Sequence, residues 1–269
     1  MLKFQKLFPK KCSIIAMVHV SPLPGTPFYG GCMQKIVDKA CRETEIYINN
    51  QVDGIIIENM HDVPYVKSKH FGPETIAVMT KVCAEVKRLI PMKVPCGIQI
   101  LTGGNREALA VAKACDFNFI RSEGFVFSHI GDEGFIDSDA GVLLRYRRNI
   151  DAEDVLIFTD IKKKHSSHTI TNDVSLIETA HAAEFFHSDG VVLTGTCTGK
   201  PADARELIGL KQNCNLPIII GSGVTVENLN QYLSADALII GSHFKIDGNW
   251  ANDVSSNCVQ LFMEAKNKL

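Results

Sequence analysis

The chain has 269 residues, of which 45% are hydrophobic and 22% are charged, and its formal net charge is −2. This length can bury one sizeable core, and the composition is that of an ordinary globular protein. Lys and Arg are spread along the chain, so there is no general attraction to nucleic acid or to an anionic membrane, although a local basic pocket is compatible with these numbers.

Nine cysteines occur singly, without any Cys-x-x-Cys pair. An odd number of scattered thiols predicts free, mostly buried cysteines in a reducing compartment. No apolar run reaches the roughly eighteen residues of a transmembrane helix. We therefore expect a cytoplasmic protein. The basic start MLKFQKLFPKK keeps organellar import open, although it lacks the arginines and serines of a transit peptide.

Short, apolar, β-branched runs alternate with amphipathic stretches along the chain. The eight runs begin at Ser13, Asp53, Cys96, Phe117, Val155, Asp189, Pro217 and Asp236. Several are apolar at odd and even positions alike, as strands covered on both faces must be. Helical patterns lie between them at 34–49, 74–89 and 174–186, and a further helix is expected to start at Thr225, with Glu227 close behind.

Eight strands alternating with helices predict an α/β fold, a single (β/α)₈ TIM barrel over residues 1–269, with residues 1–12 as a lead-in. The alternative is a doubly wound open sheet. That fold usually has fewer strands, and no Gly-x-Gly-x-x-Gly follows any strand here. The longest unassigned piece, residues 122–139, follows the fourth strand, and we interpret it as an active-site loop.

Active sites of this fold lie where strands end and βα loops begin, so polar residues at strand ends are the candidates. The catalytic candidates are His19, Glu58, Asp160, Lys162 and His165. The substrate-binding candidates are Asn59, Asp62, Gln99, Arg121, Glu123 and Thr194. Loops are polar in any protein, which alone would explain Asp62. An amide within an apolar strand, as at Gln99, needs a partner and points more strongly to function.

Asp160 and Lys162 lie two residues apart at the end of the run FTDIKKKH, which predicts that both face the same side of the strand. A carboxylate beside an amine favours the ammonium form, so we expect a fixed cation rather than a Schiff-base lysine. This ammonium would stabilise a developing enolate or carbanion, or hand over a proton. His19, Glu58 and His165 are its candidate acid–base partners.

Two glycine-containing loops follow the seventh and eighth strands and contain Gly221, Ser222, Gly223, Gly241 and Ser242. Glycine lets backbone N–H groups approach an anion, and a following helix adds a favourable dipole. Because barrels often hold a substrate phosphate in these two loops, we predict phosphate binding there. Turn geometry alone is the alternative explanation.

The expected partner is therefore a small phosphorylated metabolite, and neither nucleic acid nor a membrane; the KKKH run is short and has no interleaved aromatics. A homo-oligomer is left open. No cofactor is expected. A divalent metal held by His19, Glu58 and Asp160 is kept as a minority alternative, a metal-dependent hydrolase, without supporting ligand spacing.

Six stretches in the same order resemble the BtpA family, which includes the bacterial SgcQ proteins. They are MVHVSPLPGTPFYGG, VDGIIIENMHDVPY, GPETIAVMT, FTDIKKKHSS, DGVVLTGTCTGKP and PIIIGSGVTVENL. The resemblance covers nearly the whole chain and implies a barrel related to the ribulose-phosphate-binding group. It also implies that seven residues lie at the barrel mouth: His19, Glu58, Asn59, Asp62, Asp160, Lys162 and His165. Some members carry an amide near Glu123, which leaves this residue a hydrogen-bonding role.

The resemblance says less about activity. The founding cyanobacterial member is associated with biogenesis or stability of photosystem I, and SgcQ-like members accompany sugar-metabolism genes. Two hypotheses follow. The first is an enzyme acting on a sugar phosphate or phosphorylated nucleoside, of the lyase, isomerase or hydrolase type. The second is a non-catalytic assembly or stability factor that uses the barrel as a scaffold, with an exposed apolar patch including Phe125, Phe127 and Phe135.

Overall fold

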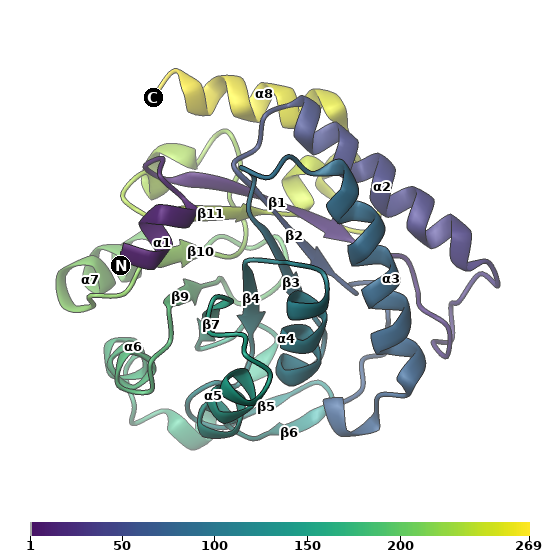
Figure 1. Cartoon of the computed structure of the whole chain (residues 1–269). Helices are drawn as coiled ribbons and strands as arrows, with labels where there is room; N and C mark the ends of the chain where they lie inside the picture. Colours follow the sequence, from purple (N-terminus) through teal and green to yellow (C-terminus); the bar gives the residue numbers. More distant parts are fainter. Residues whose placement is uncertain (1) are drawn as a thin grey trace.

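The computed structural model describes residues 2–269 and contains a closed barrel of parallel strands ringed by helices (Figure 1). Around the barrel the strands follow the order β1, β2, β3, β4, β7, β9, β10 and β11. They are β1 (Ser13–His19), β2 (Gly54–Glu58), β3 (Cys96–Gln99), β4 (Phe119–Ser122), β7 (Leu156–Ile161), β9 (Gly190–Leu193), β10 (Ile218–Ile220) and β11 (Ala237–Ile240). All eight runs expected from the sequence are therefore strands, and the predicted TIM barrel is confirmed.

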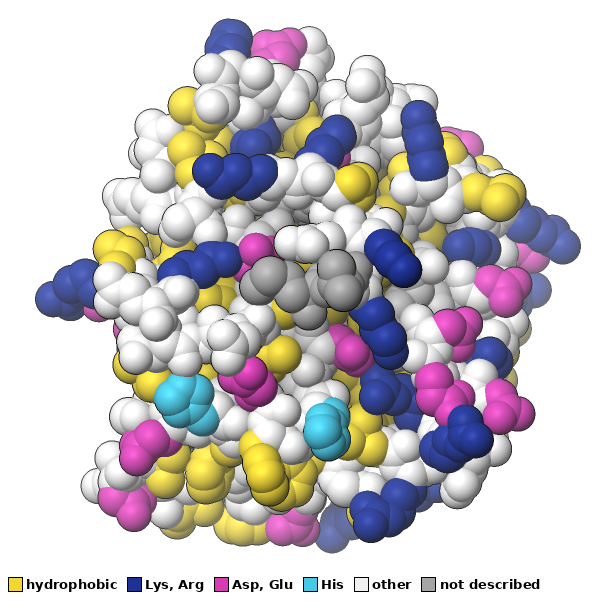
Figure 2. Space-filling model, turned by 60° about the vertical axis from the view of Figure 1, so that its left-hand side comes forward, with side chains coloured by type: hydrophobic (Ala, Val, Ile, Leu, Met, Phe, Trp, Pro, Cys, Tyr) yellow, Lys and Arg dark blue, Asp and Glu magenta, His cyan; other side chains and the backbone are white. Residues whose placement is uncertain are grey.

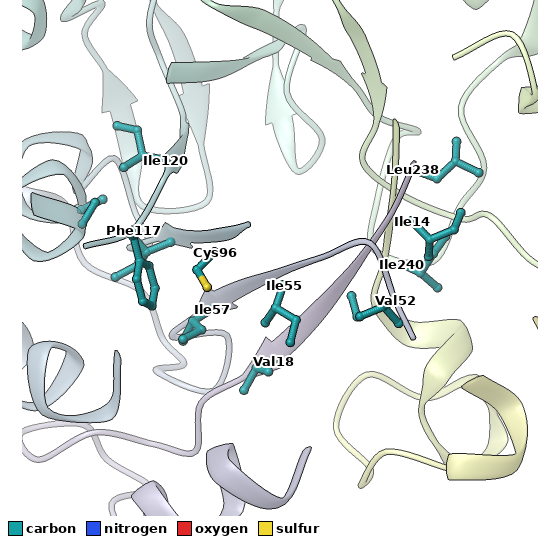
Figure 3. Packing of buried hydrophobic residues seen from close by; sticks show 14 of the residues in the cluster. Ile14, Val18, Val52, Ile55, Ile57, Cys96, Phe117, Ile120, Leu238 and Ile240 are labelled. Carbon is teal, nitrogen blue, oxygen red and sulfur yellow. The ribbon is translucent and has the colours of Figure 1, made fainter. Parts of the chain in front are cut away.

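Helices cover the outside of the barrel. They are α2 (Met33–Asn49), α3 (Pro73–Leu89), α4 (Asn105–Ala114), α5 (Ala140–Asn149), α6 (Leu176–Phe185), α7 (Ala204–Asn213) and α8 (Ser256–Asn267). The main apolar core lies between the strands and these helices. Figure 3 shows part of it, including Ile14, Val18, Ile55 and Ile57 on β1 and β2. All nine cysteines are free thiols, as the sequence predicted, but four are buried and five are half-buried, so the expectation of mostly buried thiols is not met.

A second, aromatic core fills the lower barrel. Helix α1 (Leu2–Leu7) contributes Phe4, and Phe8 follows it; both pack with Phe119 and Phe158 inside the barrel. The expected lead-in is therefore a plug that closes this end. The opposite end, where the strands finish, is left for polar residues.

The loop after β4 forms a small lid. Strands β5 (His129–Gly131) and β6 (Gly134–Ile136) make a hairpin, and β5 also pairs with β8 (Ser166–Ser167) after β7. This three-stranded sheet joins the loops of two neighbouring barrel strands. Phe125 is fully buried beneath it, whereas Phe127 and Phe135 stay partly exposed. The predicted exposure is therefore wrong for Phe125, whose ring packs into the core, and right for Phe127 and Phe135.

The remaining short elements are 3₁₀ helices: η1 (Ser68–His70), η2 (Thr169–Thr171), η3 (Leu229–Tyr232), η4 (Ser242–Phe244) and η5 (Ile246–Gly248). The α-helix expected from Thr225 is wrong, because only η3 forms there. Asn228 explains the difference: its side chain accepts from Thr225 N at 2.8 Å and donates to Gly223 O at 2.9 Å. Such side-chain bonds stabilise a loop in place of a helical turn.

Charges show no segregation on the face drawn in Figure 2, where Lys and Arg alternate with Asp and Glu. Within residues 2–269, no helix is long and apolar enough to cross a membrane.

Candidate active site at the barrel mouth

The uppermost inward-facing layer of the barrel is polar. Below it, Ile15, Met17 and Ile56 belong to the inner core; on the same two strands, the next inward positions are His19 and Glu58. Three further strands contribute Gln99, Arg121 and Asp160 to the same buried layer. Every second side chain of a strand faces the barrel interior. The same alternation that places apolar residues in the inner core therefore places these polar residues at the mouth.

A cavity of about 370 Å³ opens above this layer. Glu58, Gln99 and Arg121 form its floor, and the loops after β2, β3, β4, β7 and β9 form its walls. This volume lies within the range of small-molecule sites. The mouth is therefore a built pocket at the end of the barrel where this fold places active sites.

Asp160 is bound to Arg121, not to Lys162. The Arg121 guanidinium donates two hydrogen bonds to the Asp160 carboxylate, both at 2.9 Å, and both side chains are buried. The backbone turns left-handed at Lys162 (φ 48°), and its ammonium donates to Thr171 O at 2.8 Å, away from the mouth. The predicted Asp160–Lys162 pair is wrong because strand alternation ends at Ile161.

Lys164 lines the cavity together with Lys163, and it was not among the site residues predicted from the sequence. Burial lowers the pKa of its ammonium, and Arg121 lowers it further, whereas Glu58, Asp160 and Glu123 oppose that shift. In the part of the chain that the structure describes, no salt bridge pairs Lys164. Lys162 and Lys164 differ in role only because the backbone turns at Lys162. A run of three identical residues does not indicate where such a turn lies.

Lys163 lies beside Glu123, with the ammonium 3.3 Å from Oε1, and it also approaches Glu133 in the lid at 3.9 Å. Gln99 donates to the same Glu123 oxygen at 3.1 Å, and Gly103 N donates to the other at 3.0 Å. Glu123 is therefore a hydrogen-bonding centre, consistent with the role that the sequence left to it. Lys163, which was not among the residues predicted from the sequence, is part of the pocket wall.

His19 and Glu58 lie side by side, with His19 Nε2 3.7 Å from Glu58 Oε2. Burial lowers the pKa of His19 well below its usual value, helped by the charge of Lys245. Burial raises the pKa of Glu58, although Arg121 and Lys164 work against this. A neutral imidazole with Nδ1 3.3 Å from Trp250 O therefore faces a carboxyl group whose pKa is raised by burial.

Asn59 and Asp62 hold loops together. Asn59 accepts from Leu101 N at 2.7 Å and donates to Leu101 O and to Asp62, and Asp62 accepts from Leu23 N at 2.8 Å. Their polar groups thus connect the ends of β1, β2 and β3. Asn59 and Asp62 lie at the mouth as expected, but their polar atoms are hydrogen-bonded to other residues of the protein.

Thr194 and His165 serve the neighbouring loops. Thr194 Oγ1 accepts from Lys164 N at 3.2 Å, which fixes the backbone of the lysine. His165 lies at the cavity rim and has a left-handed backbone (φ 53°); its Nε2 accepts from Thr198 N at 3.0 Å. The two residues therefore tie the loop after β7 to the loop after β9.

The glycine loops approach the floor from the side. A β-carbon added at Gly221 would lie 3.2 Å from Arg121 Nη2, and one at Gly241 would lie 3.4 Å from the His19 ring. At Gly223 (φ 70°), an added carbon would collide with the backbone of Lys200. Gly221 and Gly241 thus bring their backbones against mouth residues, while Gly223 is covered.

The covering segment is residues 195–201. Ser222 Oγ accepts from Gly195 N at 2.8 Å and donates to Lys200 O at 2.9 Å. Gly199 lies over Ser242, since a carbon added there would be 4.0 Å from Ser242 Oγ. The five residues predicted to hold a phosphate are therefore adjacent to the mouth and lie partly under this segment.

A metal at His19, Glu58 and Asp160 is not favoured by the geometry, since Arg121 engages both oxygens of Asp160. Among residues 2–269, no group of three or more His, Cys, Asp or Glu is arranged to hold a metal ion. The chemistry available at the mouth is that of a carboxyl group, an ammonium and a buried amide.

Comparison with known sequences matches the BtpA family to residues 10–268. An uncharacterized mitochondrial protein of Caenorhabditis elegans is 46% identical over 259 residues, covering 95% of this chain and 93% of that protein. The photosystem I biogenesis protein BtpA of Synechocystis is 31% identical over 254 residues, covering 94% and 87%.

Solved structures share the fold at low identity. Orotidine 5′-monophosphate decarboxylase of Methanocaldococcus jannaschii, complexed with the inhibitor BMP, matches with a TM-score of 0.61 at 13% identity, covering 96% of this chain and 100% of that one. Thiamine phosphate pyrophosphorylase of Pyrococcus furiosus matches with a TM-score of 0.59 at 8% identity, covering 100% and 98%. These identities support the same barrel and nothing finer.

Proposed function

The chain belongs to the BtpA family, and on that premise we propose that it is an enzyme that binds a small phosphorylated metabolite at the barrel mouth. The single observation that carries this proposal is Lys164, a half-buried ammonium in a cavity whose other main cations are engaged by carboxylates. A buried cation without its own counter-ion is costly, and an anionic ligand would offset that cost.

The phosphate is proposed to lie beside Lys164 at the loops after β7 and β9, toward the neighbouring loops after β10 and β11. Gly221, Ser222, Gly223, Gly241 and Ser242 form the proposed cradle, and residues 195–201 close over it. The names of the structural neighbours support this placement, since orotidine 5′-monophosphate and thiamine phosphate are both phosphorylated. Backbone N–H groups at glycines and a nearby ammonium are the usual parts of such sites.

Catalysis is proposed to use Glu58 and Lys164. Burial raises the pKa of Glu58, which favours this carboxyl group as the proton donor, and His19 beside it would orient the carboxyl group. The Lys164 ammonium would stabilise negative charge that develops on the substrate, and its lowered pKa lets it also give up a proton. The Asp160–Arg121 pair would fix the floor. The role first assigned to Lys162 thus moves to Lys164.

Replacing each lysine by methionine tests this assignment, because Lys162 lies two residues away and points out of the mouth. The assay substrate is the phosphorylated compound that most raises the melting temperature, and product is detected by mass spectrometry. Lys164→Met should lower turnover at least about a hundredfold. Lys162→Met should stay within about twofold, with both variants melting cooperatively. Full activity in a folded Lys164→Met protein would overturn the proposal.

The compartment remains a proposal as well. The name of the Caenorhabditis elegans relative includes a mitochondrial location, which favours the organellar alternative over the cytoplasm. Imaging the full chain with a C-terminal tag, which leaves the basic start free, would distinguish the two.

A further inference from the structure

We infer that the ligand is a phosphorylated ribonucleoside rather than a simple sugar phosphate; this inference rests on the proposed function. Three features of the cavity carry it: a flat apolar wall, a pair of buried acceptors on the floor, and a cationic wall across the barrel. In that order they match a base, a ribose diol and a phosphate.

The apolar wall contains Tyr65, Trp250, Met60 and Leu101. Tyr65 has its hydroxyl occupied, since it donates to Met60 O at 2.7 Å, so the ring contributes apolar surface. Trp250 is fixed by the contact of its carbonyl with His19 and by its ring, 5.1 Å from the His61 ring. A planar base would pack on such rings, whereas a free sugar phosphate would leave them in contact with water.

The floor offers two neighbouring acceptors. Glu58 and Gln99 are register partners on β2 and β3, so their backbones are about 4.8 Å apart. Gln99 Nε2 donates to Glu123, which leaves the Gln99 Oε1 atom as an acceptor. This oxygen is buried and has no hydrogen-bond partner in the described chain. Two adjacent acceptors suit the two O–H donors of a vicinal diol.

The cationic wall comes from the loop after β7, where Lys164 supplies the charge; His165, whose pKa is lowered by burial, and Thr198 of the loop after β9 add neutral polar groups beside it. In the barrel order these two strands lie across from β1 and β2, and the β2 loop carries Tyr65. The apolar and cationic walls therefore lie on opposite sides of the barrel, and the acceptor pair lies on the floor at the foot of the apolar wall. In a ribonucleoside phosphate the ribose diol lies between the base and the phosphate.

The test uses isothermal titration of the full chain with four probes: ribonucleoside 5′-monophosphates, their 2′-deoxy counterparts, ribose 5-phosphate and inorganic phosphate. We expect at least one ribonucleoside monophosphate to bind about tenfold or more tightly than ribose 5-phosphate, because stacking is absent in the latter. Its 2′-deoxy form should bind roughly two- to tenfold more weakly, because one donor to the floor is lost.

Variants of the apolar wall test the contribution of base stacking. Trp250→Ala should remove most of the preference for the nucleotide and leave ribose 5-phosphate affinity within about twofold. Tyr65→Ala is the second variant, in case the first fails to fold. Phe185→Ala is the matched control, since this ring is 78% exposed outside the cavity and its loss should change nothing.

Equal affinity for nucleotides and ribose 5-phosphate would overturn the base-binding wall while leaving the proposed function intact. Equal affinity for ribo and deoxyribo forms would overturn the diol contact. Failure of every phosphorylated probe, ribose 5-phosphate included, to bind would count against both the inference and the proposed function.

Discussion

Glu58 is the residue where burial and charge compete most directly. It is 6% exposed, and burial raises its pKa although Arg121 and Lys164 lie close enough to lower it. A raised folded-state pKa means that folding favours the protonated form. The stabilisation is therefore complete below the usual value of 4.5 and is lost as the pH rises through the folded-state pKa.

Glu58→Gln should therefore change stability in a pH-dependent way. Glutamine resembles the protonated acid and does not titrate, so the variant and the native protein should have similar Tm values near pH 4. At pH 8 the variant should melt at a higher temperature, because it carries no buried charge. Paired thermal melts at the two pH values measure this. A Tm that falls equally at both pH values would contradict the account.

For individual residues, the sequence predicted the direction of side chains within the strands but not beyond the strand ends. Asp160 and Arg121 face inward by simple alternation, and both are in the mouth layer. Alternation then fails within two residues, because Lys162 and His165 adopt left-handed backbones that redirect the side chains. Nothing in the run KKKH fixes which lysine points inward; the tertiary contacts with Thr171 and Thr194 decide it.

Among the elements, the inner strands of the lower barrel depend on glycines that make room for aromatic rings. Gly97 on β3 faces Phe119 on β4, and Gly190 on β9 faces Phe158 on β7. The two rings pack at 5.1 Å from one another, and Phe8 lies 5.8 Å from Phe119. Closing this end with rings from α1 is thus possible only because the neighbouring strands lack side chains there.

Gly97→Ala should lower the free energy of unfolding by about 1–3 kcal/mol, because its methyl group would overlap the Phe119 ring. Combining it with Phe119→Leu should cost less than the sum of the two single changes. Gly209→Ala on helix α7 is the control; there the nearest atom is 3.9 Å away, so alanine should be neutral or stabilising. Urea denaturation of the four variants and the native protein measures these effects. Strict additivity would exclude the proposed contact.

The strands were predictable because both of their faces are buried, which leaves a continuous apolar signal. The lid was not: residues 129–136 carry little alternation, and the pairing of β5 with β8 depends on a contact across two loops. Helix α6 shows the opposite case. Ser175 and Glu178 form a capping box that the sequence displays and that sets the helix start.

At the level of the whole molecule, the barrel separates its aromatic core from its polar cavity. One end is closed by aromatic rings, and the other carries the polar layer, the cavity and the lid. Loops from strands far apart in the sequence converge there, so no single motif could have revealed the two walls. The order of strands predicted the location of the site, and the structure was needed to show which side chains reach it.

The most direct test of the central proposal, that a phosphorylated ligand binds at the mouth, is thermal unfolding of the full chain against phosphorylated metabolites, each beside its dephosphorylated twin. A ligand at one hundred times its Kd stabilises the native state by about 2.7 kcal/mol, so no assay of the reaction is needed. The account predicts that phosphorylated compounds raise the Tm, that their twins do not, and that Lys164→Met removes the effect. Equal shifts from both twins, or no shift from any compound, would contradict it.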